Sequence, residues 1–271
     1  MNKFDIYCLT SKNYEFFKYL PKNIIPIVLG DNITPSSNIL SEKEGSNLID
    51  YNKYFAELTG LYWVYKNKIN DYDSDDWIGF CHYRRLWLND NYSKNHSLNS
   101  TVFSKLLINK TKIFEGNDVV MLQPTNLKNE DLYNHFVNNH GPKLINEAFL
   151  ILDKKMSLEF QNYLKQNQFS IANMFITKKK NFIEYCEFIF PFLDSLLDYC
   201  FKNNLCIGKN IKLPAFLIER FTSFWFHRHA RVGYLSYALL NNYFISNINN
   251  KFFNTLNTPF SFRLYPTILD I

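Results

Sequence analysis

Hydrophobic and polar residues alternate along this chain in two patterns, which predict strands in some segments and helices in others. Short apolar runs bounded by polar turns predict strands at residues 4–10, 24–29, 77–83, 118–122 and 170–177. Apolar residues three or four positions apart predict helices over 52–67, near 101–109, across about 130–166, and over 181–200 and 214–229. We expect Pro191 to kink its helix, whereas Pro214 suits a first turn.

This order of elements predicts the fold class. Strands that alternate with helices are typical of an open, mostly parallel α/β sheet with helices on both faces. Ligands of such sheets bind at the carboxyl ends of the strands. The polar residues that follow predicted strands are therefore expected to share one edge, namely Thr10, Asp31, His82–Arg85, Gln123 and Thr177. A polar stretch over 34–50 predicts a long loop.

The length of the chain bounds the number of domains. A chain of 271 residues can bury most of its apolar surface in one domain. We expect residues 1–230 to form that domain. Residues 231–271 have no clear period, and we expect them to pack on the same domain as a C-terminal extension.

The charge pattern argues against nucleic-acid binding. The net charge of +5 is mild, and acids and bases are interleaved, whereas a nucleic-acid binder concentrates Lys and Arg on one helix or arm. The densest basic run, Lys178–Lys180, predicts a solvated turn, and a weak contact with anionic lipid is the alternative. We expect no nucleic-acid partner and leave peripheral membrane contact open.

The cysteines and the amino-terminal segment predict a cytoplasmic protein. The five cysteines include no CxxC pair and fit neither a zinc site nor a disulfide framework. We therefore expect reduced thiols. Residues 1–11 are too short and too polar for a signal peptide, and no apolar stretch reaches membrane-spanning length.

The densest group of chemically active side chains is Cys81–Arg85, at the end of an apolar strand. Alternation along a strand would place His82 and Arg84 on one side and Arg85 on the other. A guanidinium pairs with two oxygens of a phosphate, so this group suits a diphosphate whose developing charge must be neutralised. The alternative is that the arginines pair with a surface carboxylate such as Asp76.

Three further residues are candidates for chemistry. Glu57 lies off the apolar face of helix 52–67, as an ordinary exposed acid would. Asn173 interrupts an apolar strand and must find partners in the backbone or a ligand. Glu219 lies among apolar residues, where desolvation would raise its pKa and make it a usable general base. Pairing with Arg220 is the alternative for Glu219.

Metal motifs are weak. The triplet 71–73 has the Asp-x-Asp spelling but lies in a polar turn before the strand, not at its end. The pairs His135 with His140 and His227 with His229 lack ligand spacing. No phosphate loop, GxGxxG, GxSxG or HExxH occurs. We expect no metal cofactor, with a divalent metal as the open alternative.

Several segments together carry a family resemblance. In order along the chain they are Ala56–Trp63, Ile78–Arg85, Asn173–Ile176, Phe182 with Tyr185–Glu187 and Phe190–Pro191, and Phe216–Arg220. Together they resemble the bacterial capsular and exopolysaccharide glycosyltransferases that include galactofuranosyltransferases. The resemblance covers most of residues 1–228, and its most specific block is Gly-Phe-Cys-His-Tyr-Arg-Arg at 79–85.

The resemblance implies a single-domain, Rossmann-like glycosyltransferase fold of the A type. It also implies a UDP-sugar donor, UDP-galactofuranose or a related UDP-hexose. In such a fold Glu57 would bind donor-sugar hydroxyls or orient the arginines. The segment His82–Arg84 would occupy the place of the Asp-x-Asp motif, so that Arg84 and Arg85 hold the diphosphate in place of a metal.

The resemblance also suggests the acceptor chemistry. Asn173 would line the acceptor side, and Glu219 would deprotonate the acceptor hydroxyl in an inverting reaction, with Asp118 and Glu57 as fallbacks. The rest of the expected substrate-binding set is Thr10, Thr59, His140 and Arg220. The expected acceptor is a saccharide or lipid-linked saccharide of a growing surface polysaccharide.

Two other functions remain as alternatives. The first is a non-catalytic sugar- or nucleotide-binding module of a polysaccharide assembly complex. The second is a hydrolase acting on activated sugars, which is weaker because the sequence shows no well-defined pair of catalytic carboxylates.

Overall fold

The computed structural model describes residues 3–31, 39–89, 107–108, 112–240 and 263–264. Its centre is a twisted sheet with the strand order β10-β6-β9-β4-β1-β2-β3. These strands are β1 (Phe4–Thr10), β2 (Ile24–Val28), β3 (Leu40–Ser41), β4 (Trp77–His82), β6 (Val119–Leu122), β9 (Phe175–Lys178) and β10 (Val232–Leu235). Only β9 runs against its neighbours on this path. The predicted mostly parallel α/β sheet is confirmed.

The central strands are apolar on both faces because both faces are covered. In β4, Trp77–Cys81 are all buried, and β1 pairs with β4 so that Cys8 lies opposite Cys81. Gly79 fits where β4 passes between its neighbours, since a Cβ there would lie 2.8 Å from Cγ1 of Ile176. The short apolar runs thus mark the middle of the sheet.

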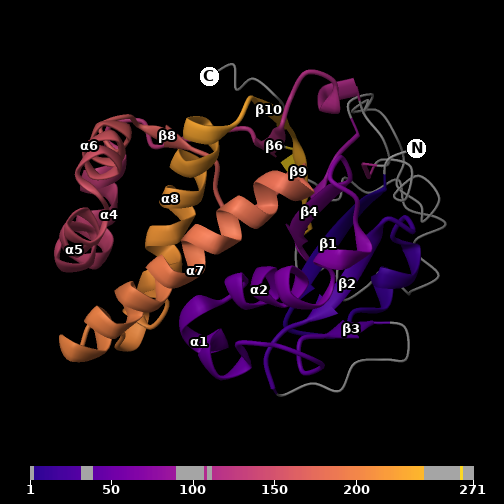
Figure 1. Ribbon diagram of the computed structural model, residues 1–271, viewed down its shortest axis with the longest axis horizontal. Helices are drawn as coiled ribbons and strands as arrows, with labels where there is room; N and C mark the ends of the chain where they lie inside the picture. The colour runs from indigo at the N-terminus through magenta and orange to yellow at the C-terminus, as the bar shows by residue number, and fades with distance from the viewer. Residues whose placement is uncertain (1–2, 32–38, 90–106, 109–111, 241–262, 265–271) are drawn as a thin grey trace.

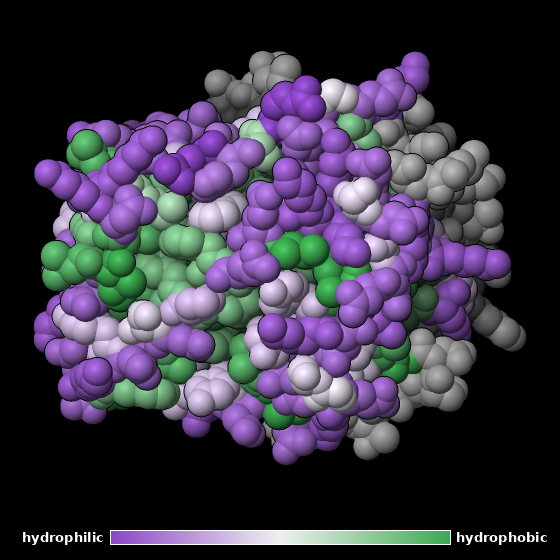
Figure 2. Space-filling model, in the orientation of Figure 1, coloured by the Kyte–Doolittle hydropathy of each residue, from purple (hydrophilic) through white to green (hydrophobic). Residues whose placement is uncertain are grey.

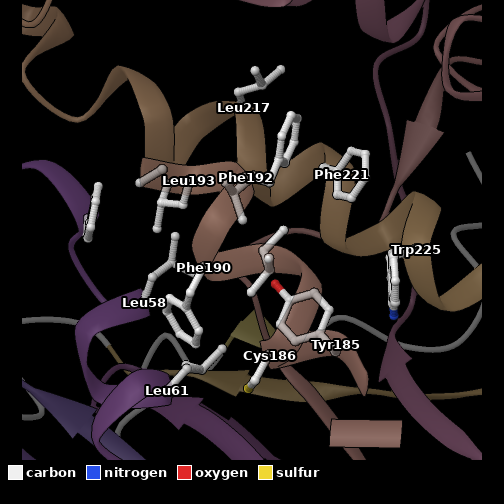
Figure 3. Close-up of a cluster of buried hydrophobic side chains, with 14 of the residues drawn as sticks. Leu58, Leu61, Tyr185, Cys186, Phe190, Phe192, Leu193, Leu217, Phe221 and Trp225 are labelled. Carbon is white, nitrogen blue, oxygen red and sulfur yellow. The ribbon is translucent and has the colours of Figure 1, made fainter. Parts of the chain in front are cut away.

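The helices form two layers on one face of the sheet (Figure 1). They are α1 (Asn52–Phe55), α2 (Leu58–Asn67), α4 (Leu132–His140), α5 (Lys143–Ile151), α6 (Lys154–Tyr163), α7 (Lys179–Lys202) and α8 (Leu213–His229). In Figure 1, α2, α7 and α8 lie next to the strands, and α4, α5 and α6 form a group beyond α8. Figure 3 shows the apolar side chains that join α2, α7 and α8, among them Leu61, Phe190 and Phe221.

The opposite face of the sheet, where further helices were expected, carries no α-helix within the described residues and has its own apolar cluster. In the described part of the chain it is covered by the short 3-10 helix η1 (Glu15–Tyr19) and by the strands β5 (Arg85–Trp87) and β11 (Tyr237–Leu239). The strand β11 pairs with β5 and with β12 (Arg263–Leu264), and β10 pairs with β6. Strands from the C-terminal segment therefore form part of the sheet, although its sequence showed no period.

Most helix predictions are confirmed, with two differences. The helix predicted over 52–67 is interrupted at Ala56, whose φ is 50°. Pro191 lies inside α7, and Pro214 lies in the first turn of α8 as predicted. The helix predicted near 101–109 falls outside the described residues except at its end, where Leu107 forms a β-bridge with Leu88. A small separate sheet pairs β7 (Thr125–Asn126) with β8 (Gln168–Phe169).

Candidate active site at the carboxyl edge of the sheet

The carboxyl ends of β1, β2, β3, β4 and β6 lie at one edge of the sheet, and β9 begins at this same edge. Thr10 and His82 end their strands at this edge, and Asp31 and Gln123 follow theirs, as expected. Thr177 does not. It pairs with Ile78 and Val119 at the far ends of β4 and β6, because β9 is antiparallel. The segment just before β9 takes its place at the carboxyl edge.

That segment is a turn, not the strand predicted over 170–177. Ala172 and Asn173 have φ values of 70° and 48°, in the left-handed region that breaks a strand. The amide of Ala172 donates to Oε1 of Glu219 at 2.5 Å, and its carbonyl oxygen is 2.8 Å from Nε2 of His82. Because a carbonyl oxygen only accepts, Nε2 of His82 carries the proton. The backbone of one residue, Ala172, therefore ties β4 to α8.

The side chain of Asn173 joins two further elements. Its Nδ2 donates to Oε1 of Glu57 at 2.8 Å, and its Oδ1 accepts from Oγ1 of Thr222 at 2.9 Å. The hydroxyl of Tyr185 is 2.7 Å from Oγ1 of Thr222 and completes the chain of hydrogen bonds. This network was missed because Thr222 and Tyr185 look like ordinary core positions of apolar helices in the sequence.

Four predicted residues therefore converge from four elements. Glu57 immediately precedes α2, His82 ends β4, Asn173 precedes β9 and Glu219 lies on α8. The sharp turn at Ala56 ends α1 and aims Glu57 at the edge of the sheet. The structure thus brings two carboxylates, an imidazole and an amide side by side.

The pKa values of two of these groups are shifted, mainly by burial. Burial raises the pKa of Glu219, and the nearby negative charge of Glu57 raises it further, while the Ala172 amide opposes the shift. Burial also lowers the pKa of His82, against the influence of Glu57 and together with that of Arg85. Glu219 is therefore a better base than an exposed glutamate, and His82 is held neutral.

The two arginines lie on a tight turn. The strand β4 ends at His82, and β5 begins at Arg85, which pairs with His82 across the turn. Side chains of directly paired residues share a face, so His82 shares its side with Arg85. The prediction that it shares its side with Arg84 is wrong, because the strand reverses.

The surroundings of the arginines leave their charges available. The guanidinium of Arg84 lies 5.6 Å from the ring centre of Tyr83, which stacks on Tyr14 at 4.8 Å. The Nε atom of Arg85 is buried without a hydrogen-bond partner among the described residues. Neither arginine forms an ion pair within that part of the chain, and the carboxylate of Asp76 accepts instead from backbone amides.

Thr10 and Thr59 serve the scaffold of this edge. The hydroxyl of Thr10 donates to the carbonyl oxygen of Lys12 at 2.7 Å. The hydroxyl of Thr59 donates at 2.7 Å to Glu42, which is completely buried and also accepts from the amide of Gly30 at 2.5 Å. Burial raises the pKa of Glu42. Nothing in the sequence pattern indicates this buried carboxylate, since Glu42 lies in a polar loop.

Arg220 lies away from this cluster. Its buried guanidinium lies 5.2 Å and 5.0 Å from the ring centres of Phe136 and Phe169, and one NH2 group is 2.6 Å from Nδ1 of His135. It forms no ion pair with Glu219, because the Glu219 side chain points to Ala172 instead. The alternative, a pairing of Glu219 with Arg220, is therefore not observed.

His140 and Asp118 also lie elsewhere. His140 stacks on Phe216 and bonds Oδ1 of Asn210 through Nδ1 at 2.9 Å. Asp118 precedes β6 at the opposite edge of the sheet, where Arg231 donates to it at 2.9 Å. The Arg231 hydrogen bond lowers the pKa of Asp118 to about 2, which makes Asp118 a poor base. Among the described residues, no three His, Cys, Asp or Glu side chains are placed to hold a metal ion.

The comparisons with known proteins bear on this site. The model of the family described as "Domain of unknown function (DUF4422)" matches residues 5–231. The chain belongs to this family. All of the converging side chains lie inside the matched segment of the DUF4422 family.

A solved structure gives the fold a precedent. The apo structure of the bifunctional glycosyltransferase WbbM aligns with a TM-score of 0.71 at 21% sequence identity, over 89% of this chain and 46% of that one. The chain therefore spans about half the length of WbbM, and the likeness shows a shared fold. No curated protein matches the sequence. Among the described helices, none is long and apolar enough to cross a membrane.

Proposed function

We propose that this protein is a glycosyltransferase that moves a hexose from a UDP-sugar to a hydroxyl of a growing surface polysaccharide. The observation that carries the proposal is the convergence of Glu57, His82, Asn173 and Glu219 beside Arg84 and Arg85 at the carboxyl edge. An α/β sheet binds its ligands at this edge. The fold shared with WbbM supports the proposal, as does the resemblance of Ile78–Arg85 to glycosyltransferases of surface polysaccharides.

The donor diphosphate binds to the two arginines. Arg85 lies close enough to lower the pKa values of both His82 and Glu219, so its positive charge acts on the centre of the site. When the bond between the sugar and UDP breaks, negative charge develops on the diphosphate, and fixed cations stabilise it. In this role Arg84 and Arg85 replace a metal ion.

Glu219 is the general base of an inverting reaction. Within the described part of the chain, the Ala172 amide is the hydrogen-bond donor to Oε1 of Glu219, and Oε2 has none. Oε2 takes the proton of the acceptor hydroxyl as its oxygen forms a bond to the anomeric carbon. The bond from that carbon to UDP breaks at the same time, and UDP leaves with the electron pair.

Glu57 orients the donor sugar. Its Oε1 is fixed by the amide of Asn173, which leaves a carboxylate of known direction for sugar hydroxyls. In this arrangement Asn173, bonded to Glu57, would lie between the donor sugar and the acceptor. We infer galactofuranose or galactose as the transferred hexose, from the sequence resemblance, and a saccharide or lipid-linked saccharide as the acceptor.

The test measures UDP release and sugar transfer by the purified protein with a panel of UDP-hexoses. Glu219→Gln should lower the transfer rate by about 10²–10⁴-fold, because it removes the base, and should keep the thermal stabilisation by donor. Arg84→Ala should lose that stabilisation. Matched controls are Glu184→Gln, an exposed acid on α7, and Arg231→Ala at the opposite edge of the sheet.

Two results would count against the proposal. If the protein binds the donor but shows neither sugar transfer nor slow donor hydrolysis, the non-catalytic binding module is favoured. Activity that vanishes with a chelator and returns with manganese would overturn the replacement of the metal by arginines. Activity that rises with pH through the raised pKa of Glu219, and a Glu219→Gln variant that lacks this rise, would support the assignment of the base.

A further inference from the structure

Large apolar side chains are exposed to solvent at the corner where α7 ends and α8 begins. We define the α7–α8 corner as residues 201–212. Phe201, Ile207 and Ile211 in it are 46%, 66% and 37% exposed. In Figure 1 this corner lies at the lower left, far from the strands. Figure 2 shows that apolar and hydrophilic side chains are mixed on this side of the molecule.

The same corner is strongly basic. Its exposed charged side chains are Lys202, Lys209 and Lys212, and residues 201–212 contain no Asp or Glu. The nearest acid along α7 is the exposed Asp198, one turn before Lys202. A local charge of +3 in twelve residues stands out in a chain whose acids and bases are otherwise interleaved.

The corner is fixed to the domain by specific contacts. The ring of Phe201 packs edge-on against Tyr54 of α1, with 5.0 Å between ring centres. Asn210 is bonded to His140 of α4, and the amide of Leu205 donates to the carbonyl oxygen of Cys200 at the end of α7. The apolar and basic side chains are thus presented on a rigid support.

We propose that the α7–α8 corner docks the protein on the surface of a bilayer that contains anionic lipids. Exposed apolar side chains beside lysines match such a surface, because the apolar groups enter the headgroup boundary while the ammonium groups meet lipid phosphates. This surface is separate from the Lys178–Lys180 run.

A second exposed apolar site fits a membrane less well. On α5 and α6, Leu150 and Leu158 are 79% and 59% exposed. Residues 147–159 hold three acids against Lys154 and Lys155, which gives this site a net charge of −1. An anionic membrane therefore attracts the α7–α8 corner more strongly than this second site. The second site, around Leu158, serves as the matched control.

The test is co-sedimentation of the full chain with vesicles. Binding is compared between phosphatidylcholine vesicles and vesicles with about one third phosphatidylglycerol, the anionic fraction that supplies the surface charge. Each lysine near such a surface contributes about fivefold to binding, so Lys202→Gln, Lys209→Gln and Lys212→Gln together should weaken it about a hundredfold. Ile207→Ser should weaken binding at high salt as well, because its contribution is apolar.

The control variant carries Lys154→Gln, Lys155→Gln and Leu158→Ser and should bind like the wild type. Equal binding to both kinds of vesicle, or an equal loss in the control variant, would overturn the proposal. The proposal would also be overturned if the protein bound heparin as tightly as it binds anionic vesicles and Ile207→Ser left that affinity unchanged. That result would indicate a soluble polyanion as the partner. Melting temperatures confirm that each variant is folded. Because the side chain of Ile207 is mostly exposed to water, Ile207→Ser should leave the melting temperature nearly unchanged.

Discussion

Asn173→Ala should be one of the most destabilising single substitutions of a polar residue in this protein. Asn173 is 3% exposed and adopts a φ of 48°. Its two side-chain hydrogen bonds, to Glu57 and from Thr222, are both removed by alanine. Alanine also lacks the tolerance of asparagine for the left-handed region.

The structure sets the magnitude of the loss. A hydrogen bond to a charged carboxylate contributes about 1.5–3 kcal/mol, and one between neutral groups about 0.5–1.5 kcal/mol. The left-handed backbone adds about 1 kcal/mol for alanine. Asn173→Ala should therefore lower the free energy of unfolding by about 3–5 kcal/mol. Asn173→Gly removes the same bonds without the backbone penalty and should be about 1 kcal/mol more stable than Asn173→Ala.

Urea denaturation followed by circular dichroism measures both variants. Thr222→Val removes only one hydroxyl, so it should cost about 1–3 kcal/mol, because the partners of that hydroxyl stay buried. If the alanine and glycine variants are equally stable and each loses less than about 1 kcal/mol, the network around Asn173 does not form as described. A separate result distinguishes the positioning of Glu57 from stability. If Thr222→Val stays folded but loses transfer activity, and Thr222→Ser restores that activity, the network positions Glu57 for the reaction.

Two other predictions test the scaffold. Burial raises the folded pKa of Glu42, so the native state binds more protons than the unfolded state above about pH 4. Stability should fall as pH rises through that raised pKa, and Glu42→Gln should gain stability over the wild type in the same window, as unfolding curves at several pH values would show. Gly79→Ala should cost about 1–3 kcal/mol in the same assay, because its Cβ would lie 2.8 Å from Ile176 and 3.1 Å from Ile6. A neutral Gly79→Ala would mean that β4 and β9 are packed less closely than described.

The sequence predicts the parts of the fold that depend on local pattern. The strands β1, β2, β4 and β6 and the helices α7 and α8 follow from apolar runs and helical spacing. The direction of β9 does not, because an antiparallel strand and a parallel strand have the same local pattern. Nor does the turn at Ala172 and Asn173, where two non-glycine residues take positive φ values because tertiary hydrogen bonds hold them.

The candidate site shows the same division. Glu57, His82, Asn173 and Glu219 could be selected from their residue types and from the family resemblance, but nothing local indicates which of them meet. Thr222 and Glu42 escaped notice because their role lies in hydrogen bonds between distant segments. Arg220 carries the same charge as the arginines of the turn, yet its position on α8 directs it to the helical layer.

The reversal of β9 is the step that assembles the site. If β9 were parallel to its neighbours, Lys178 would lie at the carboxyl edge and Asn173 would lie at the opposite edge of the sheet. Because β9 is antiparallel, the turn before it reaches the carboxyl edge, where its backbone meets both His82 and Glu219. The same turn sends the amide of Asn173 to Glu57. A shift of this one strand would therefore break the hydrogen bonds of the turn to His82, Glu219 and Glu57 at once, which is why the stability of Asn173 variants and the transfer activity should change together.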